Sequence, residues 1–581
     1  MNENIEKREL KSMIDVAMSR KPADLVIKNC QVVDVYSGTI SMGDIAISDG
    51  IIAGVGTYDG PNTADADGAY AAPGFIDSHI HIESSYVTPE EIGRLLVPCG
   101  ASTIIADPHE IVNVCGIKGM NYMLDAGEET ALDIKYMLPS CVPATPFEHS
   151  GAVIDAAAMA EPLKDKRIIG LGEFMNYPGV IAGADRDLDK IMAARHADKL
   201  IDGHSPRMSD KELNAYAVAQ IRTDHECSTV EEMQERISKG LYVLMRQGSA
   251  CHDLINLLKG VTPFNNRRCL LCSDDRQPKT ILELGHLDDH LRICVREGID
   301  PISALRMATL NAAECFRLYD RGAIAPGLRA DIVLLNNLED FYVKQVFIKG
   351  QLVAEDGKYL PPVKRIDSTP VQNSFHVKDF SESKMKLNLK SDKVHVIDIL
   401  PGGVVTGKGT ARIRRDSNGD FVRNPKEDIV KVAVVERHQG TGNVAVALLR
   451  GYGIKEGAVA LSIAHDSHNI IVVGTSDSEM TYAVKQLIAQ KGGIILVKNG
   501  EEKESMPMPI GGIMSDQSGE YVERSLTRIH EAAGTELGIS DSVEPIMTLC
   551  FMSLAVIPEL KLTDMGLFDV TKFQFISLEA E

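Results

Sequence analysis

Two kinds of hydrophobic pattern open the chain. A charge-rich segment over residues 1 to about 20 is typical of an amphipathic helix, and short apolar runs separated by turn residues then predict β-strands. The strand-like runs cover residues 24–29, 31–36 and 44–47, and similar runs return at 330–335 and 342–348. Because these two groups flank a long stretch of different pattern, we expect one small β-sandwich domain built from both flanks.

The long central stretch repeats one unit, in which an apolar run is followed by a helical pattern, usually with a polar residue between them. The runs end at His79 and His81, Asp107, Pro139, Glu173, His204, His225, Arg246 and Asp274. Helical segments fit the gaps, for example residues 88–96 and the segment 228–239, which opens with a capping-box pattern of Ser228 and Glu231. Eight β-then-α units predict a TIM (β/α)8 barrel. A doubly wound open sheet is the alternative, but no Gly-rich fingerprint follows the first strand.

A third pattern begins after residue 375. The linker before it, residues 358–375, is rich in Pro, Ser and Asp, and beyond it runs such as 429–435 and 469–474 are strand-like. We therefore expect an additional C-terminal α/β domain of about 200 residues. The predicted domains are 1–73 (N-terminal helix and part of the small β domain), 74–320 (barrel), 321–375 (return to the small β domain) and 376–581 (C-terminal domain).

Composition and charge narrow the range of partners. The chain has 61 Lys and Arg against 82 Asp and Glu, which gives a net charge of −21, and aromatic residues make up 5% with no Trp. Neither a broad basic surface nor aromatic stacking platforms are expected, which argues against nucleic acid as the main partner. The most apolar late run, residues 546–557, is too short to cross a bilayer.

The cysteines and the first residues favour a cytoplasmic location. The 11 Cys are scattered singly, which is typical of reduced thiols in a large chain. The first eight residues are charged or polar for the most part and lack the apolar region of a signal peptide. We expect a cytoplasmic protein without a membrane partner, and we expect a homo-oligomer, either a dimer or a tetramer.

Metal-capable side chains gather at the predicted strand ends. The carboxyl ends of all strands of a barrel converge on one face, where the active sites of this fold lie. His79 and His81 are two apart on a strand and point the same way, so both imidazoles can bind one ion. His-x-His alone is often accidental, but four other strand ends carry Glu173, His204, His225 and Asp274. Mixed imidazole and carboxylate ligands favour Zn, Fe or Mn.

Several motifs are similar to those of the amidohydrolase superfamily. The stretch 73–81, PGFIDSHIH, resembles its first-strand signature, and the stretch 322–333, GAIAPGLRADIV, resembles its return into the small β domain. Within the superfamily, further stretches resemble the adenine deaminases, namely HIHIESS at 79–85, DPHE at 107–110, GEFMN at 172–176, CSDD at 272–275, ERHQGTG at 436–442 and HDSHN at 465–469. The resemblance covers nearly the whole chain.

The resemblance implies a hydrolase of purine salvage that converts adenine and water to hypoxanthine and ammonia. It implies two ions per chain, with His79, His81 and Asp274 binding one, His204 and His225 binding the second, and Glu173 bridging them. It favours Mn(II) or Fe(II) over Zn(II). A metal-activated hydroxide would attack C6 of adenine, because water bound to such a metal has a pKa of about 7.

Further residues near the strand ends are candidates for moving protons and for holding the purine. The catalytic candidates are Asp274, as general base and proton shuttle, together with Glu83, His109 and Glu110. The candidates for substrate binding are Asp275, Arg246, His465 and His468. For Glu83, His109, Glu110, Asp275 and Arg246, the alternative is a partner that only fixes a ligand side chain. The loop with His465 and His468 either is held by its own hydrogen bonds or caps the mouth of the barrel.

Two other functions stay open. One is an amidohydrolase that acts on another aminopurine or on a cyclic amide or amidine. The other is a catalytically silent relative that binds purine or assembles with partners. The intact set of metal-capable residues argues against the silent relative, because such a protein has no physical need to keep them at the strand ends.

Overall fold

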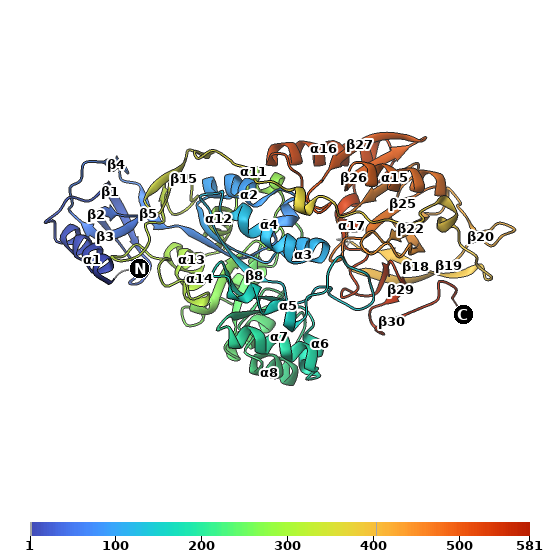
Figure 1. Ribbon diagram of the computed structural model, residues 1–581, viewed down its shortest axis with the longest axis horizontal. Coiled ribbons are helices and arrows are strands. Elements are labelled where there is room, and N and C mark those ends of the chain that lie inside the picture. Colours follow the sequence, from blue (N-terminus) through green and yellow to red (C-terminus); the bar gives the residue numbers. More distant parts are fainter. Residues whose placement is uncertain (1–2, 402–403, 581) are drawn as a thin grey trace.

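The computed structural model describes residues 3–401 and 404–580. Figure 1 shows an elongated molecule, with a small β domain at one end, a helix-covered barrel in the middle and a second sheet domain at the other end. The second domain is built from the C-terminal part of the chain and lies against the barrel. A site that both the barrel and the C-terminal domain build would therefore lie in the middle of the molecule, where the two meet.

One sheet of nine strands combines both flanks of the central stretch. Its order is β17-β16-β15-β14-β5-β1-β2-β3, with β4 paired to β1. The strands are β1 Leu25–Asp34, β2 Thr39–Ser48, β3 Ile51–Gly56, β4 Thr63–Asp65, β5 Tyr70–Pro73, β14 Ile332–Leu335, β15 Val343–Ile348, β16 Gln351–Glu355 and β17 Lys358–Tyr359. The flanks join at the antiparallel pair β5–β14, in which Pro73 faces Ile332. Helix α1, Glu3–Ala17, packs on β2 and β3.

The two apolar runs 24–29 and 31–36 contribute to one strand, β1 Leu25–Asp34, so the expectation of two separate strands there is wrong. Strand β1 runs through both apolar runs and is irregular between Ile27 and Cys30. Asn29 lies at this irregularity with a φ of 59°, a left-handed conformation that asparagine adopts more easily than most residues. The polar residues that look like a turn in the sequence thus mark a β-bulge within a strand.

Eight parallel strands curl into a TIM-like barrel. They form two sheets, β10-β9-β8-β7-β6 and β11-β12-β13, in which every neighbouring pair is parallel. The strands are β6 Phe75–Ile80, β7 Ala101–Ala106, β8 Asp133–Leu138, β9 Ile168–Phe174, β10 Leu200–Gly203, β11 Thr223–Asp224, β12 Tyr242–Arg246 and β13 Cys269–Cys272. The two sheets meet at both edges, because β13 contacts β6 and β10 contacts β11.

Helices follow the barrel strands, as the sequence pattern predicts. They are α2 Pro89–Leu96, α3 His109–Cys115, α4 Ile117–Gly127, α5 Ala156–Met159, α6 Tyr177–Ile181, α7 Asp185–His196, α8 Asp210–Val218, α9 Val230–Ser238, α10 Leu254–Leu258, α11 Pro278–Leu284, α12 Leu287–Arg296, α13 Pro301–Met307 and α14 Leu310–Cys315. The capping box of α9 lies one residue later than expected, since Thr229 and Glu232 form it. Ser228 instead donates its backbone N–H to the same Glu232 carboxylate.

The C-terminal domain is a mainly antiparallel sheet with helices. Its order is β19-β18-β23-β22-β25-β24-β26-β27, and α15 covers β24, β25 and β26. Its strands are β18 Lys393–Ile399, β19 Thr406–Arg412, β22 Ile429–Val435, β23 Val444–Arg450, β24 Ala458–Leu461, β25 Ile470–Gly474, β26 Gly493–Lys498 and β27 Glu501–Pro507. Smaller sheets are formed by β20 Arg414–Arg415 and β21 Phe421–Val422, and by β28 Leu560–Thr563, β29 Gly566–Asp569 and β30 Gln574–Phe575; the helices are α15 Asp477–Ala489, α16 Gly519–Thr535 and α17 Pro545–Cys550.

An apolar seam joins the barrel to the C-terminal domain. One continuous core cluster contains Leu95 and Ile111 from the barrel together with Val522 and Leu526 from α16. At the edge of the seam, the ring of Phe147 packs on three aromatic rings of the C-terminal domain. Burial of apolar area on this scale favours one fixed arrangement of the two parts. The C-terminal domain can therefore form a permanent wall of any cavity at the barrel face.

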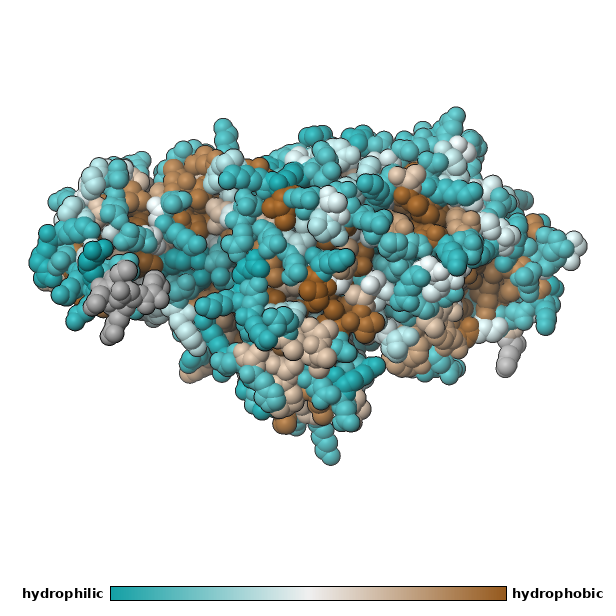
Figure 2. All heavy atoms as spheres, in the orientation of Figure 1, coloured by the Kyte–Doolittle hydropathy of each residue, from teal (hydrophilic) through white to brown (hydrophobic). Residues whose placement is uncertain are grey.

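The outer surface is mainly hydrophilic on the face drawn in Figure 2, and apolar side chains form separate patches along the length of the molecule. Among residues 3–401 and 404–580, no helix has both the length and the apolar character needed to cross a membrane.

A buried lysine in the C-terminal domain makes stability depend on pH. Lys561 is fully buried, and its ammonium donates hydrogen bonds of 2.7 and 2.9 Å to the backbone carbonyls of Val404 and Phe551. Within the described part of the chain it has no carboxylate partner. Burial lowers the pKa of Lys561 from 10.5 to about 7.

We predict that Lys561→Met removes this dependence. Because the pKa is lower in the folded than in the unfolded state, wild-type stability falls as pH drops from 10.5 to about 7 and then levels off. The melting temperature of the variant minus that of the wild type should therefore increase as the pH falls from 10.5 to about 7, and it should stay constant at lower pH. Thermal unfolding in matched buffers measures both values, and a difference that is independent of pH would contradict the prediction.

Candidate metal centre and substrate cavity

Six side chains from five strand ends meet on one face of the barrel. They are the six predicted metal ligands: His79 in β6 and His81 just after it, Glu173 in β9, His204 after β10, His225 after β11 and Asp274 after β13. The structure brings them together in overlapping groups whose ligand atoms lie within 4.8 Å of one another. All are buried except His204, which is partly exposed. The convergence of strand ends that the sequence predicts is therefore present.

The two histidines of the first strand have the ring orientation that a metal requires. Their Nε2 atoms face each other at 3.1 Å. On the opposite side of each ring, His79 Nδ1 lies 3.0 Å from Asp202 Oδ2, and His81 Nδ1 lies 2.9 Å from the backbone carbonyl of Asp107. Because these oxygens only accept, each Nδ1 carries a proton, and the tautomer that binds a metal then presents its lone pair at Nε2. Two lone pairs that face each other fit a cation between them.

Asp274 borders the same position from the other side of the barrel. Its Oδ1 lies 3.3 Å from His81 Nε2 and 3.7 Å from His79 Nε2. The backbone fixes it there, because Asp274 N–H donates to the carbonyl of His79 while its own carbonyl accepts from His81 N–H. Burial alone would raise the pKa of Asp274, but His81 and the Arg246 guanidinium hold it well below its usual range. The carboxylate is therefore ionised and available as a ligand or base.

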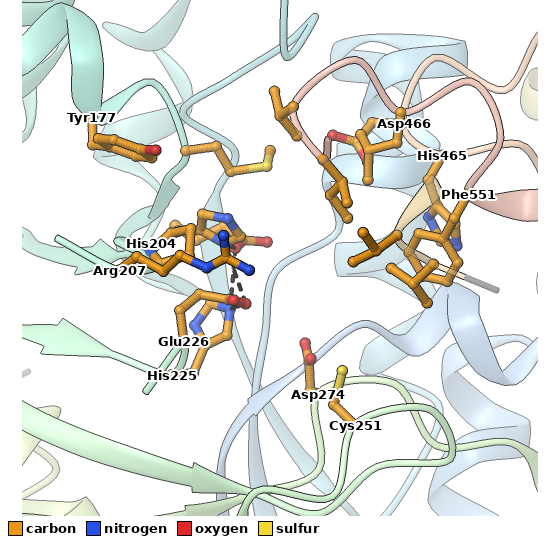
Figure 3. A pocket seen from close by; sticks show the side chains of 18 of the residues that line it. Tyr177, His204, Arg207, His225, Glu226, Cys251, Asp274, His465, Asp466 and Phe551 are labelled. Atoms are coloured by element: carbon orange, nitrogen blue, oxygen red, sulfur yellow. Dashed lines mark hydrogen bonds and ion pairs between the residues drawn. The ribbon is translucent and has the colours of Figure 1, made fainter. Parts of the chain in front are cut away.

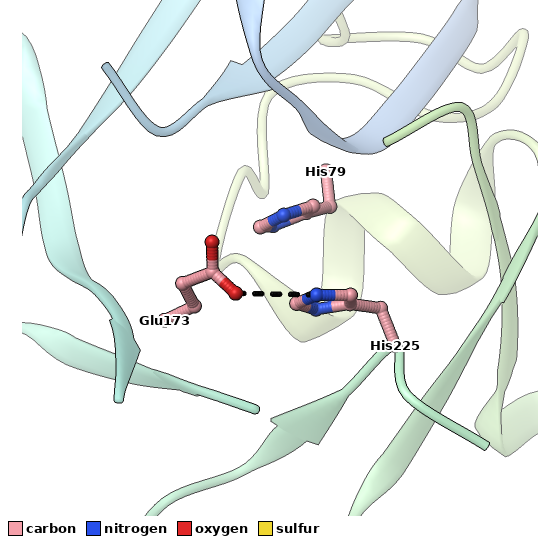
Figure 4. Close-up of side chains that lie close together, drawn as sticks. All are labelled: His79, Glu173 and His225. Atoms are coloured by element: carbon pink, nitrogen blue, oxygen red, sulfur yellow. Dashed lines mark ion pairs between the residues drawn. The ribbon is translucent and has the colours of Figure 1, made fainter. Parts of the chain in front are cut away.

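Glu173 occupies the centre of the cluster. One carboxylate oxygen, Oε2, lies 2.8 Å from His204 Nδ1 and 3.3 Å from His225 Nε2, while Oε1 lies 3.4 Å from His81 Nε2. Figure 4 shows Glu173 pointing toward His225, whose ring stacks on that of His79 with 4.1 Å between centroids. Burial alone would raise the pKa of Glu173, but His204 and His225 hold it well below its usual range. Oε2 thus faces His204 and His225, and Oε1 faces His81.

A further carboxylate belongs to this centre and was not predicted. Glu226 Oε1 lies 3.4 Å from His225 Nε2 and 3.6 Å from His204 Nδ1, and the three residues form a metal-capable group. The available signal was its position directly after His225 at a strand end. With Glu226 included, the donors are imidazoles and carboxylates throughout, a set that suits Mn(II), Fe(II) or Zn(II) rather than a thiolate-seeking metal.

Other residues hold the ligands and were also missed. Asp107 ends a predicted strand, but its carboxylate accepts the backbone N–H of Glu173 at 2.8 Å. Gly172 leaves room for this contact, because a Cβ there would lie 2.2 Å from Asp107 Oδ2. Below the ligands, Asp77 accepts from Ser273 Oγ at 2.6 Å. These contacts fix the positions of β9 and β13 along the barrel axis, so that Glu173 and Asp274 project into the cluster.

The three remaining catalytic candidates lie at different depths. His109 lines the cavity, with Nδ1 3.4 Å from Glu173 Oε1 and Nε2 3.4 Å from Glu110 Oε1. Glu110 also lines the cavity, but its two carboxylate oxygens face His465 and His468. Glu83 is buried outside the lining, where its Oε1 accepts the backbone N–H of Ile111, and burial raises its pKa to about 7.

A cavity of about 650 Å³ opens over the metal centre. Figure 3 shows His204, His225 and Glu226 on its barrel side and His465, Asp466 and Phe551 on the opposite side, which belongs to the C-terminal domain. The volume is in the range of small-molecule sites. The loop with His465 therefore does reach the cavity, and its two histidines pair with Glu110 of the barrel.

The four candidates for substrate binding differ in how free they are. Asp275, Arg246 and His465 line the cavity, whereas His468 lies behind it and is 2% exposed. The Arg246 guanidinium is engaged by three carboxylates, at 2.5 Å from Glu226, 2.7 Å from Asp253 and 3.2 Å from Asp274. Burial raises the pKa of Asp275, and the neighbouring Asp274 raises it further. Asp275 is the candidate with the most capacity left for a ligand.

We predict that Asp202→Asn weakens metal binding about 10–100-fold, because the change removes the charged acceptor that fixes the tautomer of His79. Titration of the chelator-stripped protein with Mn(II) measures the affinity. Asp198→Asn, at an exposed position before the same strand, is the matched control and should bind as the wild type does. Equal affinities in all three proteins would contradict the role given to Asp202.

Comparisons with known proteins agree with this arrangement. Residues 70–353 match the amidohydrolase family, and residues 403–574 match the adenine deaminase C-terminal domain. A protein named adenine deaminase 2 from Desulfotalea psychrophila is 65% identical over 574 residues, which are 99% of this chain and 100% of that protein. The adenine deaminase of Ligilactobacillus salivarius is 51% identical over 578 residues, 99% of this chain and 100% of that protein.

Among solved structures, an enamidase described as a member of the amidohydrolase superfamily covers 59% of this chain and 98% of its own, at 19% identity and a TM-score of 0.44. The relatives compared above match from end to end, and both family matches fall on the parts of the chain that build the centre and its cover. The chain therefore belongs to the adenine deaminase family of amidohydrolases.

Proposed function

We propose that this chain catalyses the hydrolysis of adenine to hypoxanthine and ammonia and serves purine salvage. The observation that carries the proposal is the buried cluster of four histidines and two carboxylates at the floor of a cavity, in a chain whose full-length relatives are named adenine deaminases. Such a cluster is the donor set of a hydrolytic metal centre.

We propose two divalent ions per chain. His79, His81 and Asp274 would hold one ion, His204 and His225 the second, and Glu173 would bridge them. The distances of Glu173 to His204 and His225 through one oxygen and to His81 through the other support the bridging role. Mn(II) or Fe(II) are favoured over Zn(II). When bound, divalent ions at this site lower the pKa of water to about 7, which makes hydroxide available at neutral pH.

Side chains of the protein would then carry out the proton transfers of the reaction. Asp274 would accept a proton from the attacking water and deliver it to the exocyclic amine, which leaves as ammonia; the position of its carboxylate beside His79, His81 and Arg246 supports this role. His109, between Glu173 and Glu110, is the candidate for passing protons along the cavity wall. Glu83, which accepts the backbone N–H of Ile111 outside the lining, is a further candidate for proton delivery. Asp275 would accept a purine ring N–H, and Arg246 would hold Asp274 and Glu226 in place.

The wider assignments from the sequence stay predictions. We infer a (β/α)8 barrel with a flanking β-sandwich and the domain boundaries 1–73, 74–320, 321–375 and 376–581. The match of residues 403–574 to one family and 70–353 to another supports this division. A cytoplasmic location, a homodimer or homotetramer, and the absence of nucleic acid and membrane partners are likewise proposed from composition.

We predict that protein reconstituted with Mn(II) or Fe(II) under reducing, anaerobic conditions releases ammonia from adenine. Asp274→Asn should lower the rate about 10²–10⁴-fold, because the proton carrier is lost. Asp356→Asn is the matched control, since Asp356 also has a left-handed φ, 44° against 60° for Asp274, but lies exposed in the small β domain. A coupled ammonia assay measures all three rates.

The same assay separates the alternatives. Ammonia from guanine, cytosine or adenosine but not from adenine, with two ions verified per chain, would contradict the adenine assignment and favour another amidohydrolase. A protein that binds purine, holds no metal and releases no ammonia would be the silent relative.

A further inference from the structure

A second group of metal-capable side chains lies on the opposite wall of the cavity. Glu110, at the start of helix α3, meets His465 and His468 of the loop between β24 and β25. One atom of each residue lies within 4.8 Å of those of the other two. His465 Nδ1 is 2.5 Å from Glu110 Oε1, and His468 Nε2 contacts Glu110 Oε2. Two imidazoles from one domain thus converge on one carboxylate from the other.

The charges around this group favour a cation. Glu110 and Asp466 are 2% and 3% exposed, and within the described part of the chain both form ion pairs with histidines and with neither lysine nor arginine. Asp466 Oδ2 is buried, and no hydrogen-bond partner is found for it among the described residues. The negative charge of two carboxylates is therefore matched only by imidazoles. Two carboxylates in this place could balance the charge of a divalent ion.

A plain ion pair accounts for only part of this geometry. A single ion pair would use one imidazole, whereas each oxygen of Glu110 faces an imidazole of the loop, Oε1 that of His465 and Oε2 that of His468. Two imidazoles and one carboxylate are a donor set that Mn(II), Fe(II) and Zn(II) accept.

The loop is held in place by contacts outside the ligands. Ser467 Oγ donates to Glu148 at 2.7 Å, and Asn469 Nδ2 donates to the carbonyl of His149 at 2.8 Å. The buried Arg437 guanidinium donates to the carbonyl of His468. Because ligand positions that are fixed by outer contacts bind metal without a cost of ordering, the loop is preorganised. Glu110, His465 and Asp466 also line the cavity, which gives an ion a path of entry.

We propose that Glu110, His465 and His468 form a third divalent-metal site, separate from the cluster around Glu173 and facing it across the cavity. The site takes Mn(II), Fe(II) or Zn(II) and ties the C-terminal domain to the barrel. Glu110 then acts as a ligand rather than as a proton carrier, and His465 and His468 reach a substrate only through the ion. The inference does not depend on adenine being the substrate.

Metal stoichiometry tests the proposal. Chelator-stripped full-length protein is dialysed to equilibrium against saturating Mn(II) under reducing conditions, and bound metal is counted by inductively coupled plasma mass spectrometry. We expect three ions per chain in the wild type and two in His468→Ala and in His465→Ala. His395→Ala, which changes a histidine of the C-terminal domain in β18 that does not line the cavity, is the matched control and should keep three.

Two results would overturn the third site: two ions in the wild type, or an unchanged count in both cavity-wall variants. If one variant fails to fold, as judged by circular dichroism, the other variant and Glu110→Gln decide the question. The ammonia assay keeps this outcome distinct from the proposed function. Two ions with full deaminase activity remove the third site alone, whereas three ions without activity on adenine remove the adenine assignment alone.

Discussion

The interaction on which the site depends is that of the buried Glu173 carboxylate with histidines that follow other strands of the barrel. One oxygen serves His204 and His225, and the other faces His81 and His109. A buried carboxylate is costly unless it is paired, so the barrel must close tightly enough to bring these strand ends within a few ångströms. The contact between Asp107 and the backbone of Glu173, which Gly172 makes possible, sets the height of the carboxylate. The same closure creates the metal centre.

The C-terminal domain completes what the barrel begins. Its loop 465–469 forms the wall opposite the metal centre, and Phe551 packs beside His465 with ring centroids 4.8 Å apart. Because an apolar seam fixes this domain on the barrel, the wall is a constant part of the cavity rather than a mobile cover. A small substrate in such a space meets fixed charges on both walls, and electrostatic contacts are stronger there than in bulk water.

The positions of the six candidate metal ligands were predictable because they follow a local rule. Each follows an apolar run, and parallel strands in a closed barrel must present these ends on one face. Contacts between distant segments follow no such rule. No periodic pattern in the sequence therefore indicates that Glu110 pairs with His465. Asp202 and Glu226 were missed for a related reason, since each is adjacent or next-adjacent to a stronger candidate. The bulge at Asn29 and the helix cap at Thr229 show why the exact ends of strands and helices were harder to predict. Several polar residues lie close together there, and the structure decides which of them forms the bulge or the cap.

The central claim is that two ions share Glu173. Crystals of protein loaded with Mn(II), measured at the manganese absorption edge, test it most directly. In the cluster around Glu173, the account predicts two anomalous peaks about 3.5–4 Å apart, one against His79, His81 and Asp274 and one against His204 and His225, with Glu173 between them. A single peak in this cluster, or two peaks that do not both contact Glu173, would contradict it.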